Sequence, residues 1–179
     1  MRMLRALRGA VLGWRGILAG RTDWARHFAL TGPGFATALV LYFLLAFLVF
    51  IAGAGTVALS PINVVMGLFV FGLYVAALVI GTFATRMMLR WQGSILDLLV
   101  PGTYAMMLFL LLGALLAPLG PLGLALALAV VAVLVFRLGR MAGRWSVGIS
   151  AAFAVLTVVL LVALPMTLYM LASPAFVAP

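Results

Sequence analysis

The amino-acid sequence predicts an all-α integral membrane protein, with five transmembrane helices preceded by an N-terminal amphipathic helix at the membrane interface. Three observations lead to this prediction. Of the 179 residues, 68% are hydrophobic and only 7% are charged, which is too few charges to cover a water-facing surface. The uncharged runs are long enough to cross a hydrocarbon core of about 30 Å, a distance that takes about 20 helical residues. The eleven basic residues fall into short clusters between these runs.

The charged and reactive residues exclude several classes of function. All eleven cations are Arg, the only acids are Asp23 and Asp97, and the net charge is +9. A nucleic-acid-binding protein would carry basic and aromatic groups on a soluble module, whereas Arg clusters between apolar runs are typical of cytoplasmic loops. The chain has no Cys and a single His. That inventory is too small for a catalytic triad, a carboxylate pair or a His-rich metal site, so we expect no catalysis and no cofactor.

The N-terminal segment, residues 1–34, begins with the pattern of an amphipathic helix. At 100° per residue, arginines fall on one arc of residues 1–19 and large apolar residues on the opposite arc. We expect a surface anchor in the headgroup plane, with the arginines toward anionic lipid and Trp14 at the interface. A curvature sensor and a packing arm on a partner subunit are the alternatives. The arginine arc holds Arg2, Arg5, Arg8 and Arg15, and the apolar arc holds Met3, Leu4, Leu7, Val11, Trp14, Ile17 and Leu18.

A polar stretch connects this helix to the first span. Thr22 is placed to cap a short helix with Asp23 in its first turn, and Asp23 could pair with Arg26 or His27. A proton relay through Asp23 and His27 is the less favoured interpretation, because relays use ionisable groups inside spans. Residues 32–34, Gly-Pro-Gly, predict a break before the chain enters the bilayer.

Five spans follow from the uncharged runs within a transmembrane domain at residues 35–171. Residues 98–136 form a run of 39 uncharged residues, too long for one helix, and the sequence Pro-Leu-Gly-Pro-Leu-Gly from Pro118 predicts a hairpin in its middle. Residues 172–179 are expected to form a short outside tail. The predicted spans are residues 35–59, 62–85, 98 to the hairpin, 122–136 and 147–171.

The positions of the arginines predict the orientation. Six lie in residues 1–34, two near 86–97 and three near 137–146, and none lies in the other two loops or the tail. Because short cytoplasmic loops are rich in Arg, we expect the N-terminus inside and the C-terminus outside. With five spans, all eleven arginines fall on the cytoplasmic side.

The connection between the second and third spans holds the main candidate residues. Ser94 and Asp97 have the spacing of a capping box, with the acid in place of the usual Glu in the first turn of the third span. Arg86 or Arg90 would neutralise Asp97. A binding or gating role for Asp97 is the alternative to this structural one.

Inside the spans the side chains are interpreted as packing material. Threonine hydroxyls usually bond to their own helix, so a substrate pathway lined by them is the less favoured interpretation. Small residues four apart allow helices to approach closely. These pairs are Ala77 and Gly81, Gly113 and Ala117, Ala125 and Ala129, and Gly148 and Ala152.

The segment from Gly93 to Ala105 resembles a known family. Gly93-Ser94, Asp97-Leu98 and the later Tyr104-Ala105 at the start of a central span are similar to the bacterial branch of the Yip1-domain membrane proteins. Over residues 35–171, this resemblance implies five spans, a cytoplasmic N-terminus, an outward C-terminus and no enzymatic activity. The Asp-Leu-x-Gly-Pro signature of the eukaryotic members is missing, so the resemblance does not extend to vesicle trafficking.

Three function classes remain, in order of preference. The first is a structural, assembly or accessory subunit of a larger complex in the bacterial inner membrane. Its expected partners are anionic lipids and either other membrane subunits or a second copy of the chain. The second is a small transporter or channel component. The third, a membrane-embedded enzyme, would need more Asp, Glu, His or Cys near the interface than this chain has.

Overall fold

The computed structural model describes residues 2–54 and 60–172, and within them the chain is helical with no strands. Helices α2 to α6 are each long and apolar enough to cross a membrane. The predicted all-α fold with five such helices is therefore confirmed, and it indicates a multi-pass membrane protein. In chain order the elements are α1 (Arg2–Leu18), the 3-10 helix η1 (Thr22–His27), α2 (Gly32–Ala54), α3 (Pro61–Leu89), α4 (Leu96–Leu116), the 3-10 helix η2 (Ala117–Leu119), α5 (Pro121–Met141) and α6 (Val147–Ala172).

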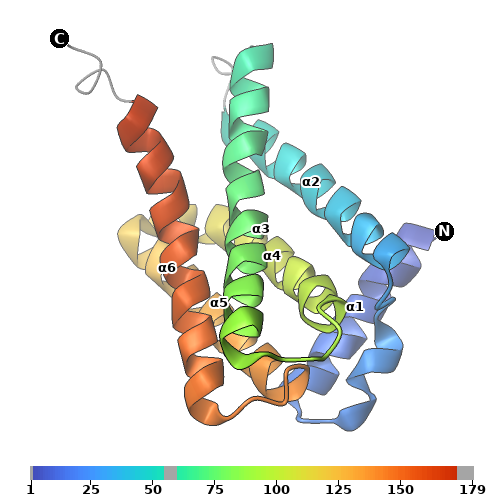
Figure 1. Cartoon of the computed structure of the whole chain (residues 1–179). Coiled ribbons are helices and arrows are strands. Elements are labelled where there is room, and N and C mark those ends of the chain that lie inside the picture. The colour runs from blue at the N-terminus through green and yellow to red at the C-terminus, as the bar shows by residue number, and fades with distance from the viewer. Residues whose placement is uncertain (1, 55–59, 173–179) are drawn as a thin grey trace.

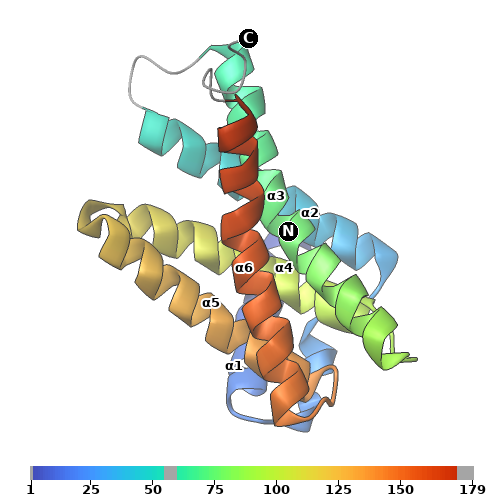
Figure 2. The ribbon, with the colours of Figure 1, turned by 60° about the vertical axis from the view of Figure 1, so that its left-hand side comes forward.

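Helix α4 is the centre of the arrangement (Figure 1). It packs against α1, α2, α3 and α5, and it is the most buried of the five long helices. Helix α6 packs along α3 and α5, and the hairpin of α4 and α5 crosses α6 (Figure 2). Helix α1 packs on η1 and also contacts α2, α4 and α5, so the N-terminal segment is packed on the bundle rather than apart from it.

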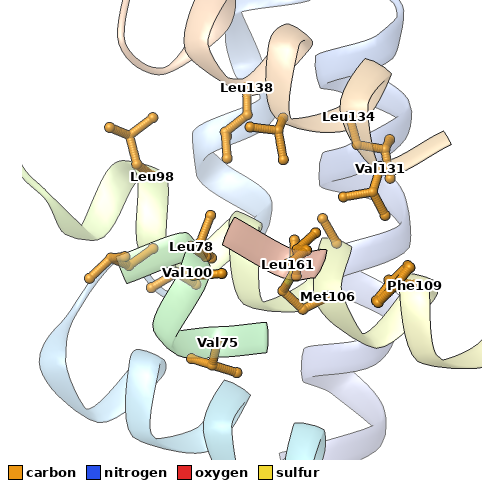
Figure 3. Close-up of a cluster of buried hydrophobic side chains, with 14 of the residues drawn as sticks. Val75, Leu78, Leu98, Val100, Met106, Phe109, Val131, Leu134, Leu138 and Leu161 are labelled. Carbon is orange, nitrogen blue, oxygen red and sulfur yellow. The ribbon is translucent and has the colours of Figure 1, made fainter. Parts of the chain in front are cut away.

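The core between these helices is mainly aliphatic, with side chains from α3, α4, α5 and α6 (Figure 3). Leu78 of α3 and Met106 of α4 are fully buried there. Gly102 allows α3 to approach α4, because a Cβ added at this position would lie 2.6 Å from Cδ2 of Leu78. Gly81 has the same role between α3 and α6, where an added Cβ would lie 2.8 Å from Oγ1 of Thr157.

The first long helix begins earlier than the sequence predicts. Gly32-Pro33-Gly34, expected to break the chain, is the first turn of α2. Thr31 precedes it, and the Thr31 hydroxyl accepts a hydrogen bond from the Gly34 N–H at 3.2 Å. A Pro in the first turn of a helix costs nothing because its missing N–H would have no partner there. The predicted end of this span, residues 55–59, lies outside the described residues, as does most of the predicted tail (173–179).

Two helices extend past arginines that were expected to end them. Helix α3 includes Arg86 and continues to Leu89, and α5 continues past Phe136 to Met141, so the fourth span is not short. Long Arg side chains can reach the headgroups from the last turns of a helix. A charge near the end of an apolar run therefore marks the membrane surface without ending the helix.

The arginine-bearing connections lie at one end of the molecule. The α3–α4 connection, the α5–α6 connection and η1 are together at the lower end of Figure 1. Trp91 and Trp145, one from each connection, stack edge to face with ring centroids 5.6 Å apart. The ring of Trp145 packs in turn against Phe153 of α6. This end is where we place the candidate sites.

Candidate functional site

Asp97 lies in the first turn of α4, as predicted, but Ser94 does not cap the helix. The N-cap is Ile95, whose backbone is already helical, and no side chain bonds to the end of the helix. The backbone carbonyl of Ser94 accepts from the Asp97 N–H at 3.1 Å, while the Ser94 side chain is exposed. The capping-box prediction is wrong because the helix begins one residue later than that motif requires.

Arg86 and Arg90, the arginines expected to neutralise Asp97, do not pair with it within the described residues 60–172. Arg90 ends α3 in a left-handed conformation with φ 49°, and its backbone N–H bonds to the carbonyls of Arg86 and Met87. The Arg90 side chain is exposed and that of Arg86 is half-buried. In the described part of the chain, Asp97 forms no ion pair with either arginine. The left-handed turn at Arg90 directs the chain away from α3 before α4 begins. Arg86 and Arg90 are therefore near Asp97 in the sequence but, among the residues that the structure describes, form no ion pair with it.

Trp14 of α1 contacts α4. Its indole Nε1–H donates to the carbonyl of Pro101 at 3.2 Å. Pro101 lies inside α4 and has no N–H, which leaves the carbonyl of Asp97 without its usual helix donor. An indole N–H that is partly buried needs an acceptor, and the α4 backbone supplies one. The hydrogen bond makes Trp14 a contact between α1 and α4.

Helix α1 packs on η1 through a face of small residues that the sequence analysis did not identify. A Cβ added at Gly9 would lie 2.6 Å from the carbonyl oxygen of His27, and one added at Gly16 would lie 3.1 Å from Cβ of Trp24. Gly13 lies directly against the ring of Phe28. The spacing of these glycines, four and three residues apart, is the signal that could have revealed this face.

Between α1, η1 and the starts of α2 and α4 lies a cavity of about 560 Å³, here called the basic pocket. Arg5 of α1 and Arg26 and His27 of η1 line it, and none of the lining residues is acidic. The rest of the wall is Ala6, Gly9, Phe28, Ala29, Gly34, Thr37, Val100 and Tyr104. The sequence shows basic residues in each segment but gives no sign that Arg5 and Arg26 share a cavity.

Asp23 and His27 line a second cavity, of about 370 Å³, together with Arg15 and Arg21. Asp23 lies in the first turn of η1, as predicted, but Thr22 does not cap it, because Thr22 is already inside the helix and Arg21 is the N-cap. Both Asp23 and His27 are exposed and lie outside the long helices. Their position therefore does not favour a proton relay across the membrane.

Inside the long helices the threonine hydroxyls donate hydrogen bonds to backbone carbonyls of their own helices, as predicted. The hydroxyls of Thr82, Thr103 and Thr157 are buried, and each donates to the carbonyl four residues earlier, at 2.7–2.8 Å. Tyr42 is also buried, and its hydroxyl donates to the carbonyl of Phe71 at 2.7 Å. Thr56 lies outside the described residues. Over residues 2–54 and 60–172 there is no group of His, Asp or Glu that could hold a metal ion.

Two apolar cavities open between the helices at the other end of the bundle. They have volumes of about 430 and 300 Å³, and Tyr74, Phe109 and Leu124 line both. The rings of Tyr74 and Phe109 meet edge to face, with centroids 5.2 Å apart. Only apolar and aromatic side chains line these cavities, so they suit hydrocarbon rather than a charged ligand.

Models of known protein families, curated proteins and solved structures were compared with the chain, and none of them matches. The geometry therefore leaves two candidate sites at the arginine-bearing end, Asp97 at the start of α4 and the basic pocket. Of the cavities at this end, the basic pocket is lined by basic residues without an acid, whereas Asp23 lines the smaller one.

Proposed function

We propose that this chain is a non-enzymatic membrane protein that acts as a structural, assembly or accessory subunit of a larger complex in the bacterial inner membrane. The observation that carries the proposal is the small-residue surface of α5, where Ala125 and Ala129 are exposed one turn apart. Surfaces of this kind let a neighbouring helix approach closely within a bilayer. Ala77 and Gly81 have the same spacing and are buried within the chain, where Gly81 lies against Thr157 of α6.

Further small residues on the outside support the same role. Gly148 and Ala152 of α6 are exposed, and a Cβ added at Gly148 would meet nothing within 4 Å. A Cβ added at Gly113 of α4 would also meet nothing within that distance. A helix of a partner protein could therefore approach the lipid-facing surface closely at α4 and α6 as well as at α5.

The N-terminal helix is proposed to lie at the membrane interface. Arg5, Arg8 and Arg15 are exposed on α1, and so are the apolar side chains of Leu4 and Val11. A helix with arginines beside an exposed apolar strip suits the boundary between headgroups and acyl chains. The face of α1 that carries Gly9 and Gly16 packs on η1. Helix α1 would therefore belong to the folded bundle and would not bind lipid as a separate segment.

The orientation and the family are part of the same proposal. The arginine-bearing connections gather at one end, which supports a cytoplasmic location for that end, with the N-terminus inside and the C-terminus in the periplasm. The resemblance of the segment containing Gly93, Ser94 and Asp97 to bacterial Yip1-domain proteins implies the same topology. It also implies a role without catalysis.

A small transporter or channel component is the alternative, and the two apolar cavities that share Tyr74 and Phe109 favour it. Transport sites usually have charged groups or broken helices at mid-depth. In the described residues, the charged groups of the long helices lie near the helix ends. The subunit role is therefore preferred.

The proposal can be tested by isolating the full chain from native membranes in a mild detergent. We expect a second membrane protein in constant stoichiometry, and we expect A125L/A129L to abolish its association because two Leu side chains would hold the helices apart. Val40→Leu, at an exposed apolar position of α2, is the matched control and should retain the partner. Isolation of the chain alone, or only with copies of itself, would contradict an accessory role.

A further inference from the structure

We propose that the basic pocket is a specific binding site for one phosphate group, supplied either by the headgroup of an anionic phospholipid or by a soluble phosphate compound. The inference goes beyond the subunit role and does not depend on it. It rests on the charge, the free donors, the size and the position of the pocket.

The charge of the pocket is positive without compensation. Arg5 comes from α1 and Arg26 from η1, so two guanidinium groups converge from separate elements on one cavity. Asp23 and Asp97, the two acids of the chain, do not line it. An anion is the ligand that offsets such an arrangement.

The guanidinium donors of the pocket, those of Arg5 and Arg26, form no hydrogen bond within the described part of the chain. Among the described residues, the only guanidinium group that donates a hydrogen bond to the protein is that of Arg140, to the carbonyl of Trp145. The donors of Arg5 and Arg26 therefore remain available. The planar guanidinium group matches two oxygens of a phosphate at once, which favours phosphate over a halide ion.

The backbone segments around the pocket are closely packed. Gly9 brings α1 against the carbonyl of His27, and Gly34 brings the first turn of α2 against the carbonyl of Ala29. Phe28 and Tyr104 form an aromatic part of the wall, with ring centroids 6.0 Å apart. A volume of about 560 Å³ lies within the range of about 300–1,000 Å³ that is usual for small-molecule sites, and it exceeds the size of a single ion.

The position of the pocket suits a headgroup. Its lining comes from α1, from η1 and the residues after it, and from the starts of α2 and α4. The pocket thus lies beside the N-terminal parts of two long apolar helices. Because the ends of a membrane-spanning helix lie near the headgroups, we expect phospholipid phosphates within reach of the pocket. Arg8 and Arg21 lie in the same part of the chain but do not line the pocket, so they provide an internal control.

The experiment is native mass spectrometry of the full-length protein in a mild detergent, with added dioleoyl phosphatidylglycerol or dioleoyl phosphatidylcholine. We expect one phosphatidylglycerol per chain, bound more tightly than phosphatidylcholine. The variant R5Q/R26Q should weaken this binding by at least about tenfold, because each arginine supplies a charge-assisted contact. The control R8Q/R21Q removes the same charge outside the pocket and should change binding by about twofold or less.

A competition with inorganic phosphate separates the two sources of the ligand. If phosphate alone binds and R5Q/R26Q abolishes that binding, the site takes a soluble phosphate; if only the phospholipid binds, it takes a headgroup. Equal weakening by the two double variants, or equal binding of the two lipids, would overturn the proposal, because diffuse attraction would then explain the result. Arg5 and Arg26 are exposed, so we expect their replacement to preserve the helix content. If the double variant unfolds, the single variants R5Q and R26Q decide the same question.

Discussion

Replacing Trp14 with Phe tests whether α1 is docked on α4. The change keeps an aromatic ring and removes the single hydrogen bond from Nε1 to the carbonyl of Pro101 at 3.2 Å. A hydrogen bond of this kind contributes about 0.5–1.5 kcal/mol, which corresponds to a factor of about 2–13 in the docking equilibrium of α1. The bond is partly buried, and its loss leaves the Pro101 carbonyl with one partner fewer. We therefore expect the effect to be confined to α1 and the first turns of α4.

The assay is hydrogen exchange of the full-length protein in detergent, followed by mass spectrometry of its peptides. Peptides from α1 should exchange about 2–13 times faster in W14F, while peptides from α3 and α6 should be unchanged. Trp91→Phe is the control, because Trp91 stacks on Trp145 where the α3–α4 and α5–α6 connections meet. This variant should leave the exchange of α1 unchanged. Unchanged exchange of α1 in W14F, or faster exchange in every helix, would refute a hydrogen-bonded dock between α1 and α4.

Three further predictions follow from particular residues. Ser60→Ala should lower the free energy of unfolding by about 0.5–2 kcal/mol, because the Ser60 hydroxyl caps α3 by accepting from the Asn63 N–H, whereas Ser94→Ala should change it by less than about 0.5 kcal/mol. Equal losses in thermal or denaturant unfolding would restore the capping role of Ser94. Gly9→Ala should destabilise the contact of α1 with η1 by about 1–3 kcal/mol, because its Cβ would lie 2.6 Å from the carbonyl oxygen of His27; Gly113→Ala, where an added Cβ meets nothing within 4 Å, should not destabilise the chain. A similar response of the two Gly variants in the same unfolding assay would contradict the close approach. A reporter enzyme fused after Pro179 should be active on the outer side and one in the α5–α6 connection on the cytoplasmic side; a cytoplasmic C-terminal reporter would exclude the five-span topology.

Local signals predicted the helical spans because hydrophobicity acts on each segment independently. A run of apolar residues enters the bilayer whatever its neighbours do, so the number of spans and the hairpin at Pro118 could be predicted without any contact. The boundaries were less certain. Thr31 and Gly32 show why, since a Gly-Pro-Gly sequence can either break a helix or begin one, and the hydrogen bond to the Thr31 hydroxyl decides which.

The candidate sites depended on contacts that sequence spacing does not encode. Ser94 and Asp97 had the spacing of a cap, and the cap did not form because Ile95 already has helical backbone angles. The apolar arc of α1 predicts a surface anchor at the membrane. Part of that arc is instead used inside the protein, where Ile17 is fully buried and Trp14 bonds to α4.

The sequence by itself determined the class of the protein, the five apolar helices and the gathering of arginines in three segments. These properties follow from composition and from hydrophobic runs, which are local along the chain. Only the tertiary structure placed Arg5 beside Arg26 and His27 in one cavity and placed Gly9 against the carbonyl of His27. The physical reason is that a pocket is made by packing segments distant in sequence, and such packing depends on the shapes of all the side chains between them.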